Sequence, residues 1–172
     1  EILKQISENY RKVRNTFRFL LANINNEEDF TRADLVAVSE LPKLDQYMLA
    51  LLNDINEKCQ LVYQEYRFSD VTTLLTNLMT NEFSAYYLDF TKDILYIEQK
   101  DSPRRRQVQT VLYHAVDVLV RLWAPILVHT AEEVNDFFQG EAQSIHLGKF
   151  AEMFAVEDAE ALKAQVARLM LI

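Results

Sequence analysis

Three basic side chains near the N-terminus, Lys4, Arg11 and Arg18, recur every seven residues. A helix turns roughly 100° per residue, so this spacing brings each side chain back to nearly the same face. The face lies nearly opposite an apolar stripe that runs from Ile6 to Ile24. We call these three residues the basic rail. A row of cations along a helix can bind the phosphates of a polyanion.

The basic rail has polar and aromatic neighbours on the same predicted helix. Asn15 falls on the same side, and Arg14 falls at its edge. Phe19 is out of phase with the apolar stripe, which predicts an exposed ring that can stack on a base or a sugar. A solvated face, or a face docked on a neighbouring domain, explains the same spacing. The candidate RNA-binding residues are Lys4, Arg11, Arg14, Asn15 and Arg18.

A second basic cluster, Arg104-Arg105-Arg106, falls in the first turn of another predicted helix. The helix dipole disfavours positive charge at this end, so negative groups should compensate the cluster. Asp101 and Glu98 are the nearest acids in the sequence and are the expected partners. Phosphate binding is the alternative interpretation.

Residues that could catalyse a reaction or bind a metal do not form a recognisable motif. His114 precedes Asp117 by one helical turn, a spacing that suits a general-base pair but is also common on helix surfaces. Cys59 is in phase with an apolar stripe, which predicts a core residue. The sequence has no Gly-rich phosphate loop, no Cys pair at zinc spacing, and no His-Glu-x-x-His or Glu-x-x-His motif. We therefore expect no catalytic, metal or cofactor site in this chain.

The overall charge of −8 does not favour a nucleic-acid binder, because a basic surface gains energy by releasing counterions from phosphates. The charge is, however, unevenly distributed. Residues 1–18 hold five basic and two acidic side chains, a net of +3, and residues 131–170 hold three basic and eight acidic ones, a net of −5.

Composition favours an all-α fold. Only two Gly and three Pro occur in 172 residues, too few turn-formers for a multi-stranded sheet. The single cysteine cannot form an internal disulfide, which predicts a reducing, cytoplasmic setting. No apolar run approaches the roughly 18 residues of a membrane span. The chain begins without Met and ends without a polar tail, so we expect one domain over residues 1–172 that is excised from a longer chain.

Apolar residues at helical spacing run over residues 6–24, 44–66, 71–97 and 108–122. The third stripe consists of Val71, Leu75, Leu78, Tyr86, Phe90, Ile94 and Ile97, and the fourth of Val108, Leu112, Ala115, Leu119 and Leu122. Between the first two stripes, residues 23–39 are polar and predict a long connection with at most one short turn. Pro42 should open the second helix. Ser69 or Asp70 should cap the third, whose phase falters at Asn81-Glu82 and predicts two helices or a kink.

The fourth helix should begin at Ser102-Pro103 and end near Trp123-Ala124, ahead of Pro125. The run Thr130-Ala131-Glu132-Glu133 matches a capping box that would start a short fifth helix, and Gly140 marks its expected end. Residues 143–150 should be a connection, and residues 157–170 a last amphipathic helix. The prediction is a bundle of four main helices with shorter helices after them.

Three stretches resemble a known family. Residues 10–23, YRKVRNTFRFLLAN, resemble the opening helix of the anticodon-binding domain in the isoleucyl, valyl and leucyl subgroup of class I aminoacyl-tRNA synthetases. Residues 84–96, SAYYLDFTKDILY, and residues 113–134, from YH through RLWAPIL to TAEEV, resemble the isoleucyl members. The segment QSIHL at 143–147 is also similar, so the resemblance covers essentially the whole chain in the family's order.

Four positions depart from the family's usual pattern. Asn135 and Tyr47 stand where Trp is usual, Gln46 stands where Arg is expected, and Ile94 stands where Arg often occurs. These departures bear on packing near Asn135 rather than on the resemblance itself.

The resemblance implies a helical bundle that docks beside a catalytic core and packs along the anticodon stem and loop of isoleucine tRNA. The parent enzyme would attach isoleucine to that tRNA with ATP and Mg²⁺, and with zinc in many bacterial members. The sequence lacks the ATP-site signatures of the His-Ile-Gly-His and Lys-Met-Ser-Lys-Ser types, so this chain is expected to hold no cofactor and to be inactive alone. A monomer is expected. The alternatives are a docking domain whose RNA contacts lie elsewhere, the valyl equivalent, and an independent helical enzyme.

Overall fold

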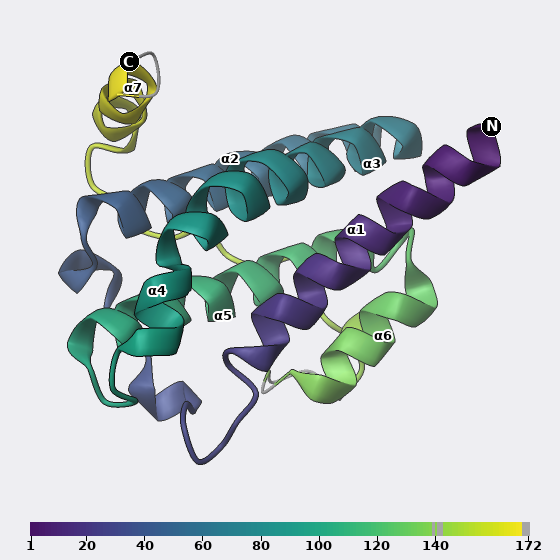
Figure 1. Ribbon diagram of the computed structural model, residues 1–172. Coiled ribbons are helices and arrows are strands. Elements are labelled where there is room, and N and C mark those ends of the chain that lie inside the picture. The colour runs from purple at the N-terminus through teal and green to yellow at the C-terminus, as the bar shows by residue number, and fades with distance from the viewer. Residues whose placement is uncertain (139, 141–142, 170–172) are drawn as a thin grey trace.

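The long helix α5 (Pro103–Trp123) lies at the centre of the bundle and is buried along most of its length. It packs against α1 (Ile2–Ala22), α2 (Lys43–Gln64), α4 (Asp89–Ile97) and α6 (Val128–Phe137), and Figure 1 shows it running behind α1. Its predicted stripe is confirmed, because every position of that stripe is fully buried: Val108, Leu112, Ala115, Leu119 and Leu122.

The computed structural model describes residues 1–138, 140 and 143–169. The other elements are, in chain order, η1 (Arg32–Asp34), η2 (Val38–Glu40), α3 (Phe68–Asn77), the π-helix η3 (Leu78–Leu88), η4 (Ile145–Leu147) and α7 (Ala159–Leu169). Within these described ranges every regular element is a helix, which confirms the all-α bundle. No helix in this part of the chain is long and apolar enough to cross a membrane.

The predicted change of phase at Asn81-Glu82 falls within the π-helix η3, which joins two α-helices, α3 and α4, into one continuous helical segment. The side chains that face the core recur every four residues: Val71, Leu75, Met79, Phe83, Tyr87, Thr91 and Leu95. In an α-helix, steps of four overshoot one turn by roughly 40°, so such a row would drift around the helix. The i→i+5 bonds of the π-helix wind less per residue and return the row to the core.

This π-helix overturns the second half of the predicted third stripe. Tyr86, Phe90 and Ile97 were expected to face inward, but all three are exposed, and Phe90 keeps 61% of its surface accessible. Tyr87, one position after Tyr86, is fully buried instead. The prediction assumed 3.6 residues per turn throughout, and the change in winding moves the buried face by one residue.

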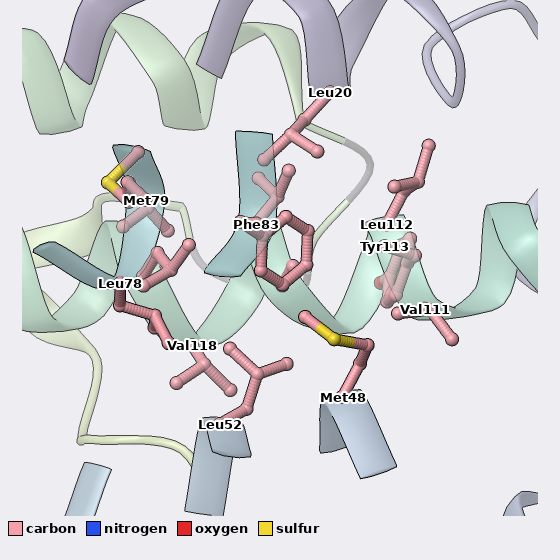
Figure 2. Close-up of a cluster of buried hydrophobic side chains, with 14 of the residues drawn as sticks. Leu20, Met48, Leu52, Leu78, Met79, Phe83, Val111, Leu112, Tyr113 and Val118 are labelled. Atoms are coloured by element: carbon pink, nitrogen blue, oxygen red, sulfur yellow. The ribbon is translucent and has the colours of Figure 1, made fainter. Parts of the chain in front are cut away.

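Side chains from four helices meet in the core shown in Figure 2. Met48 of α2 points toward Phe83 of η3, and Leu52 of α2 lies beside Val118 of α5. Leu20 of α1 lies on the other side of Phe83. Burying each such side chain stabilises the fold by about 1.5–3 kcal/mol. The core therefore holds α1, α2, η3 and α5 in fixed positions relative to one another.

The predicted helix ends are partly right. Pro103 is the first residue of α5 and α5 ends at Trp123, as expected, but the Ser102 hydroxyl donates to the Glu98 carboxylate instead of capping the helix. α3 begins at Phe68, so neither Ser69 nor Asp70 caps it. α6 ends at Phe137, before Gly140. α7 agrees with the predicted last helix, whose final residue, Met170, lies outside the described residues.

The connection between α1 and α2 has two short 3-10 helices, η1 and η2, where at most one turn was predicted. Phe30 is buried ahead of η1, and the Val36 amide donates to the Thr110 hydroxyl of α5 at 3.0 Å. Thr31 and Asp34 form a capping box at η1. The polar side chains of Thr31 and Asp34, which belong to the stretch predicted as an irregular loop, form these local hydrogen bonds.

The arginine cluster of α5 is structural, and its partners are not the predicted ones. Arg105 donates to both carboxylate oxygens of Asp29, at 2.5 and 2.7 Å, and the two side chains are only 9% and 10% exposed. Arg106 donates to the Asp29 carbonyl and lies over the Phe30 ring. The Arg105 hydrogen bonds lower the pKa of Asp29.

Arg104 pairs with Asp45 of α2, which is fully buried and also accepts a 2.9 Å hydrogen bond from the Tyr87 hydroxyl. Asp101 and Glu98, the predicted partners, are therefore replaced by carboxylates that are distant in sequence. These pairs occupy all three arginines, which argues against phosphate binding by this cluster.

Candidate nucleic-acid interface

All three residues of the basic rail are exposed on α1. No side chain in the described ranges forms an ion pair with Lys4, Arg11 or Arg18, so their charges face solvent. At a rise of roughly 1.5 Å per residue, the rail spans about 21 Å of helix. This length allows contact with several successive phosphates of a nucleic acid.

The apolar stripe on the opposite face of α1 is buried only in its second half. Val13, Phe17 and Leu20 lie in the core, whereas Ile6 is exposed. Figure 1 shows the reason: the N-terminal end of α1 extends beyond the helices that cover the rest of it.

Arg14, at the edge of the rail, is paired within the protein. Its guanidinium donates two hydrogen bonds of 2.7 Å to the carboxylate of Glu133 on α6. One turn earlier, the Tyr10 hydroxyl shares a 2.9 Å hydrogen bond with Thr130. The bond to Thr130 lowers the pKa of Tyr10, and the bonds from Arg14 lower that of Glu133. These contacts fasten α1 to α6.

The predicted capping box at Thr130 is therefore wrong. α6 begins at Val128, so Thr130 and Glu133 lie inside the helix and are not at its start. Both side chains reach α1 instead of the backbone of their own helix. The motif has the spacing of a cap, but tertiary partners were available to both side chains.

A groove of about 490 Å³ runs between α1 and α6. Its lining includes Arg14, Asn15 and Arg18 from the predicted RNA-binding set, but not Lys4 or Arg11. The other lining residues are Phe17, Leu21, Ala22, Asn25, Asn26, Thr130, Glu133, Val134 and Phe137. The groove thus combines cationic, amide and apolar surface.

The exposed aromatic ring at this site is Phe137, not Phe19. Phe19 is half-buried against the core, which corrects the expectation that it is exposed. Phe137, the last residue of α6, is 56% exposed, while Phe138 is buried. Because adjacent helical residues point about 100° apart, the Phe-Phe doublet indicated that one ring would leave the core, but not which one.

The other candidate chemistry of the sequence does not form a site. Asp117 accepts a 2.8 Å hydrogen bond from Arg121, and His114 packs against Phe154 with 4.8 Å between the ring centres. Burial lowers the pKa of His114. Cys59 is fully buried, as predicted, and burial raises the pKa of its thiol to about 12. The described residues contain no group of His, Cys, Asp or Glu side chains that could hold a metal ion.

Comparison with known families decides which fold family this is. Residues 45–171 match the family model described as the anticodon-binding domain of tRNA ligase. The chain belongs to this family. The match begins at the third residue of α2 and runs through α7, so it covers most of the core, the arginine cluster and the α6 wall of the groove.

Individual relatives extend the similarity to α1. The chain is 47% identical over 167 residues to an isoleucine–tRNA ligase of Bacillus mycoides, and 46% identical over 166 residues to one of Listeria monocytogenes. Each alignment covers 96% of this chain and 18% of the relative. The chain therefore spans about a fifth of the length of these relatives, and most of α1 lies within the aligned region.

The positions that depart from the usual anticodon-binding domain pattern are accommodated in the fold. Tyr47 and Asn135, which stand where Trp is usual, are both buried. Gln46 donates a 2.7 Å hydrogen bond to the Leu41 carbonyl and so closes the turn before α2. All three side chains are thus part of the packed structure of this chain.

Proposed function

We propose that this chain is the module of an isoleucine–tRNA ligase that binds the anticodon arm of isoleucine tRNA. The observation that carries the proposal is the 46–47% identity to isoleucine–tRNA ligases over 96% of the chain, together with the anticodon-binding family match. The complete ligase would attach isoleucine to its tRNA with ATP and Mg²⁺, and zinc would be bound outside this chain. The module itself would hold no cofactor and would act as part of a cytoplasmic monomer, beside the catalytic core.

The basic rail and the groove are the surface that would meet RNA. Lys4, Arg11 and Arg18 are free of ion pairs in the described structure and lie on one face of a helix. Phosphate contacts of this kind position an RNA and release counterions, so affinity should fall steeply with salt. Arg14 is the exception among the candidate residues, because Glu133 already binds it.

The test is a titration of isoleucine tRNA with the complete ligase carrying Arg11→Glu and Arg18→Glu. Affinity should fall at least tenfold, and the dependence on salt should become shallower by about two counterions. The matched control is Lys43→Glu with Lys58→Glu, which makes the same charge change at exposed positions on α2. Equal affinity losses in both double variants would contradict the rail as the contact surface. No loss in either variant would place the RNA contacts elsewhere.

A docking role is the second candidate, favoured by the exposed apolar end of α1. Ile2, Leu3 and Ile6 are 75%, 81% and 58% exposed, an arrangement that leaves apolar surface without a partner in the described structure. The catalytic core of the longer chain would cover them. Hydrogen exchange of residues 2–6 should then be slower in the complete ligase than in the separate chain, and equal exchange would argue against docking through this end.

A further inference from the structure

The exposed ring of Phe137 lies at the edge of the α1–α6 groove, next to a floor formed by Phe17, Leu21 and Val134. An aromatic ring exposed beside an apolar floor provides a platform on which a planar ring can stack. Phe17 and Val134 are buried, so the floor is held rigidly by the core. The platform therefore has a fixed position relative to α1.

Three amide side chains and two guanidinium groups line the same groove, and two of the amides and one guanidinium could contact a ligand. Asn15 and Asn25 are exposed, and their side chains form no hydrogen bond with the described part of the protein. An amide offers both a donor and an acceptor, which is the pair of groups that the edge of a base requires. The Arg18 guanidinium, free of an acidic partner in the described ranges, suits a phosphate.

The charge of the groove also suits an anion. Its charged lining residues are Arg14, Arg18 and Glu133, so two positive charges and one negative charge give a net of +1. The chain as a whole carries −8. The carboxylate of Glu133, which would repel a phosphate, is neutralised by its two hydrogen bonds from Arg14.

We infer that this groove binds one unpaired nucleotide of the bound RNA, with its base stacked on Phe137 and its phosphate held by Arg18. The inference rests on the proposed function and specifies what the anticodon arm places here. The volume of about 490 Å³ lies within the roughly 300–1,000 Å³ typical of small-ligand pockets. Asn15 and Asn25 bond the edge of the base, and the paired Arg14 and Glu133 form the wall behind it.

The experiment combines Phe137→Ala in the complete ligase with isoleucine tRNAs that lack the base at one anticodon-loop position at a time. Stacking on an aromatic ring strengthens nucleic-acid binding severalfold to about a hundredfold per base. Phe137→Ala should therefore weaken binding of the intact tRNA about tenfold. At one loop position, removing the base should weaken binding by the wild-type ligase about as much as Phe137→Ala does. The same base removal should not weaken binding by the Phe137→Ala ligase any further. That non-additive result identifies the stacked base.

Two controls isolate stacking from a general effect. Phe90→Ala removes a ring of similar exposure on α4, outside the groove, and should leave affinity unchanged. Phe137→Tyr keeps an aromatic ring and should retain nearly wild-type affinity. The inference would be overturned if the two losses added at every loop position. It would also be overturned if Phe137→Ala bound the tRNA as tightly as the wild type, which is the result expected if a protein segment occupies the groove. If either of these results is found and the double variant Arg11→Glu with Arg18→Glu still binds tRNA more weakly, the proposed function stands without the nucleotide site.

Discussion

Arg14 on α1 and Glu133 on α6 are 119 residues apart in sequence and are joined by two parallel hydrogen bonds of 2.7 Å. Both side chains are about half exposed, so the pair lies at the surface, in the wall of the groove. A bidentate pair fixes orientation as well as distance. This contact sets the charge of the groove, because it uses one arginine of the predicted RNA-binding set to neutralise the acid beside it.

Glu133→Gln should release Arg14 for contact with phosphate. We expect tighter binding of isoleucine tRNA at low salt and a salt dependence steeper by about one counterion. The measurement is a titration at several salt concentrations with the complete ligase. Asp136→Asn makes the same charge change on α6 without freeing an arginine, so its salt dependence should match the wild type. A slope for Glu133→Gln equal to that of Asp136→Asn would refute this role for Arg14.

Asp29→Ala should destabilise the fold strongly, because it leaves the buried guanidinium of Arg105 without its carboxylate. Breaking a buried ion pair from one side costs about 3 kcal/mol or more. Urea unfolding of the chain measures the change in the free energy of unfolding. Asp101→Ala, at the exposed acid that sequence alone suggested as a partner, should change it by less than about 0.5 kcal/mol. Similar losses in both variants would show that the Asp29 pair is not the stabilising one.

The Asp29 carboxylate should also contribute to acid sensitivity. Its hydrogen bonds from Arg105 lower its pKa in the folded state, so its contribution to stability is complete above the unfolded value of about 3.9. That contribution is lost as the pH falls through the lowered folded pKa. The stability difference between wild type and Asp29→Asn should therefore be largest above about pH 4 and shrink in stronger acid. Unfolding free energies at several pH values test this, and a constant difference would be inconsistent with it.

The π-helix predicts unequal losses of stability for substitutions at two phenylalanines seven residues apart. Phe83 is fully buried, so Phe83→Ala should lower the free energy of unfolding by about 3–5 kcal/mol. Phe90, which the apolar spacing placed in the core, is exposed, and Phe90→Ala should cost less than about 1 kcal/mol. Urea unfolding of the two variants compares them directly. Similar losses at the two positions would instead indicate an uninterrupted α-helix, in which residues seven apart share one face.

Cys59 should be inert to thiol reagents while the chain is folded. Burial raises its pKa to about 12, so the thiol stays protonated at pH 8, and the side chain is fully buried. Labelling at pH 8 should be slow in buffer and rapid in urea, where the thiol regains an ordinary pKa. Labelling in buffer at the rate seen in urea would show that Cys59 is accessible.

Local periodicity was sufficient to predict the class of fold and most of its helices. The stripe from Val108 to Leu122 is buried as expected, because burial of one helical face follows directly from apolar spacing. Pro103 and Pro125 bracket α5 because proline acts on the backbone of its own neighbours. Cys59 lies in the core for the same reason as the apolar residues in phase with it.

Predictions about polar partners failed where they assumed that the nearest residue in sequence is the nearest in space. Arg105 was expected to use acids a few residues away, but its partner Asp29 is 76 residues away. Thr130 and Glu133 have the spacing of a cap, yet they bind Tyr10 and Arg14. Local rules describe the partners a side chain has in an isolated helix, and the folded chain brings others closer.

The sequence by itself determined that this chain is a helical bundle, that one helix carries a row of cations, and that its motifs resemble an anticodon-binding domain. These properties depend on residue types at short spacing, which a linear pattern contains. Only the tertiary structure decided that Arg14 is paired, that Phe137 is the exposed ring, and that Asn15 and Arg18 share a groove with α6. Each of these depends on how helices more than 100 residues apart pack, because the same side chain can face solvent, a partner or the core.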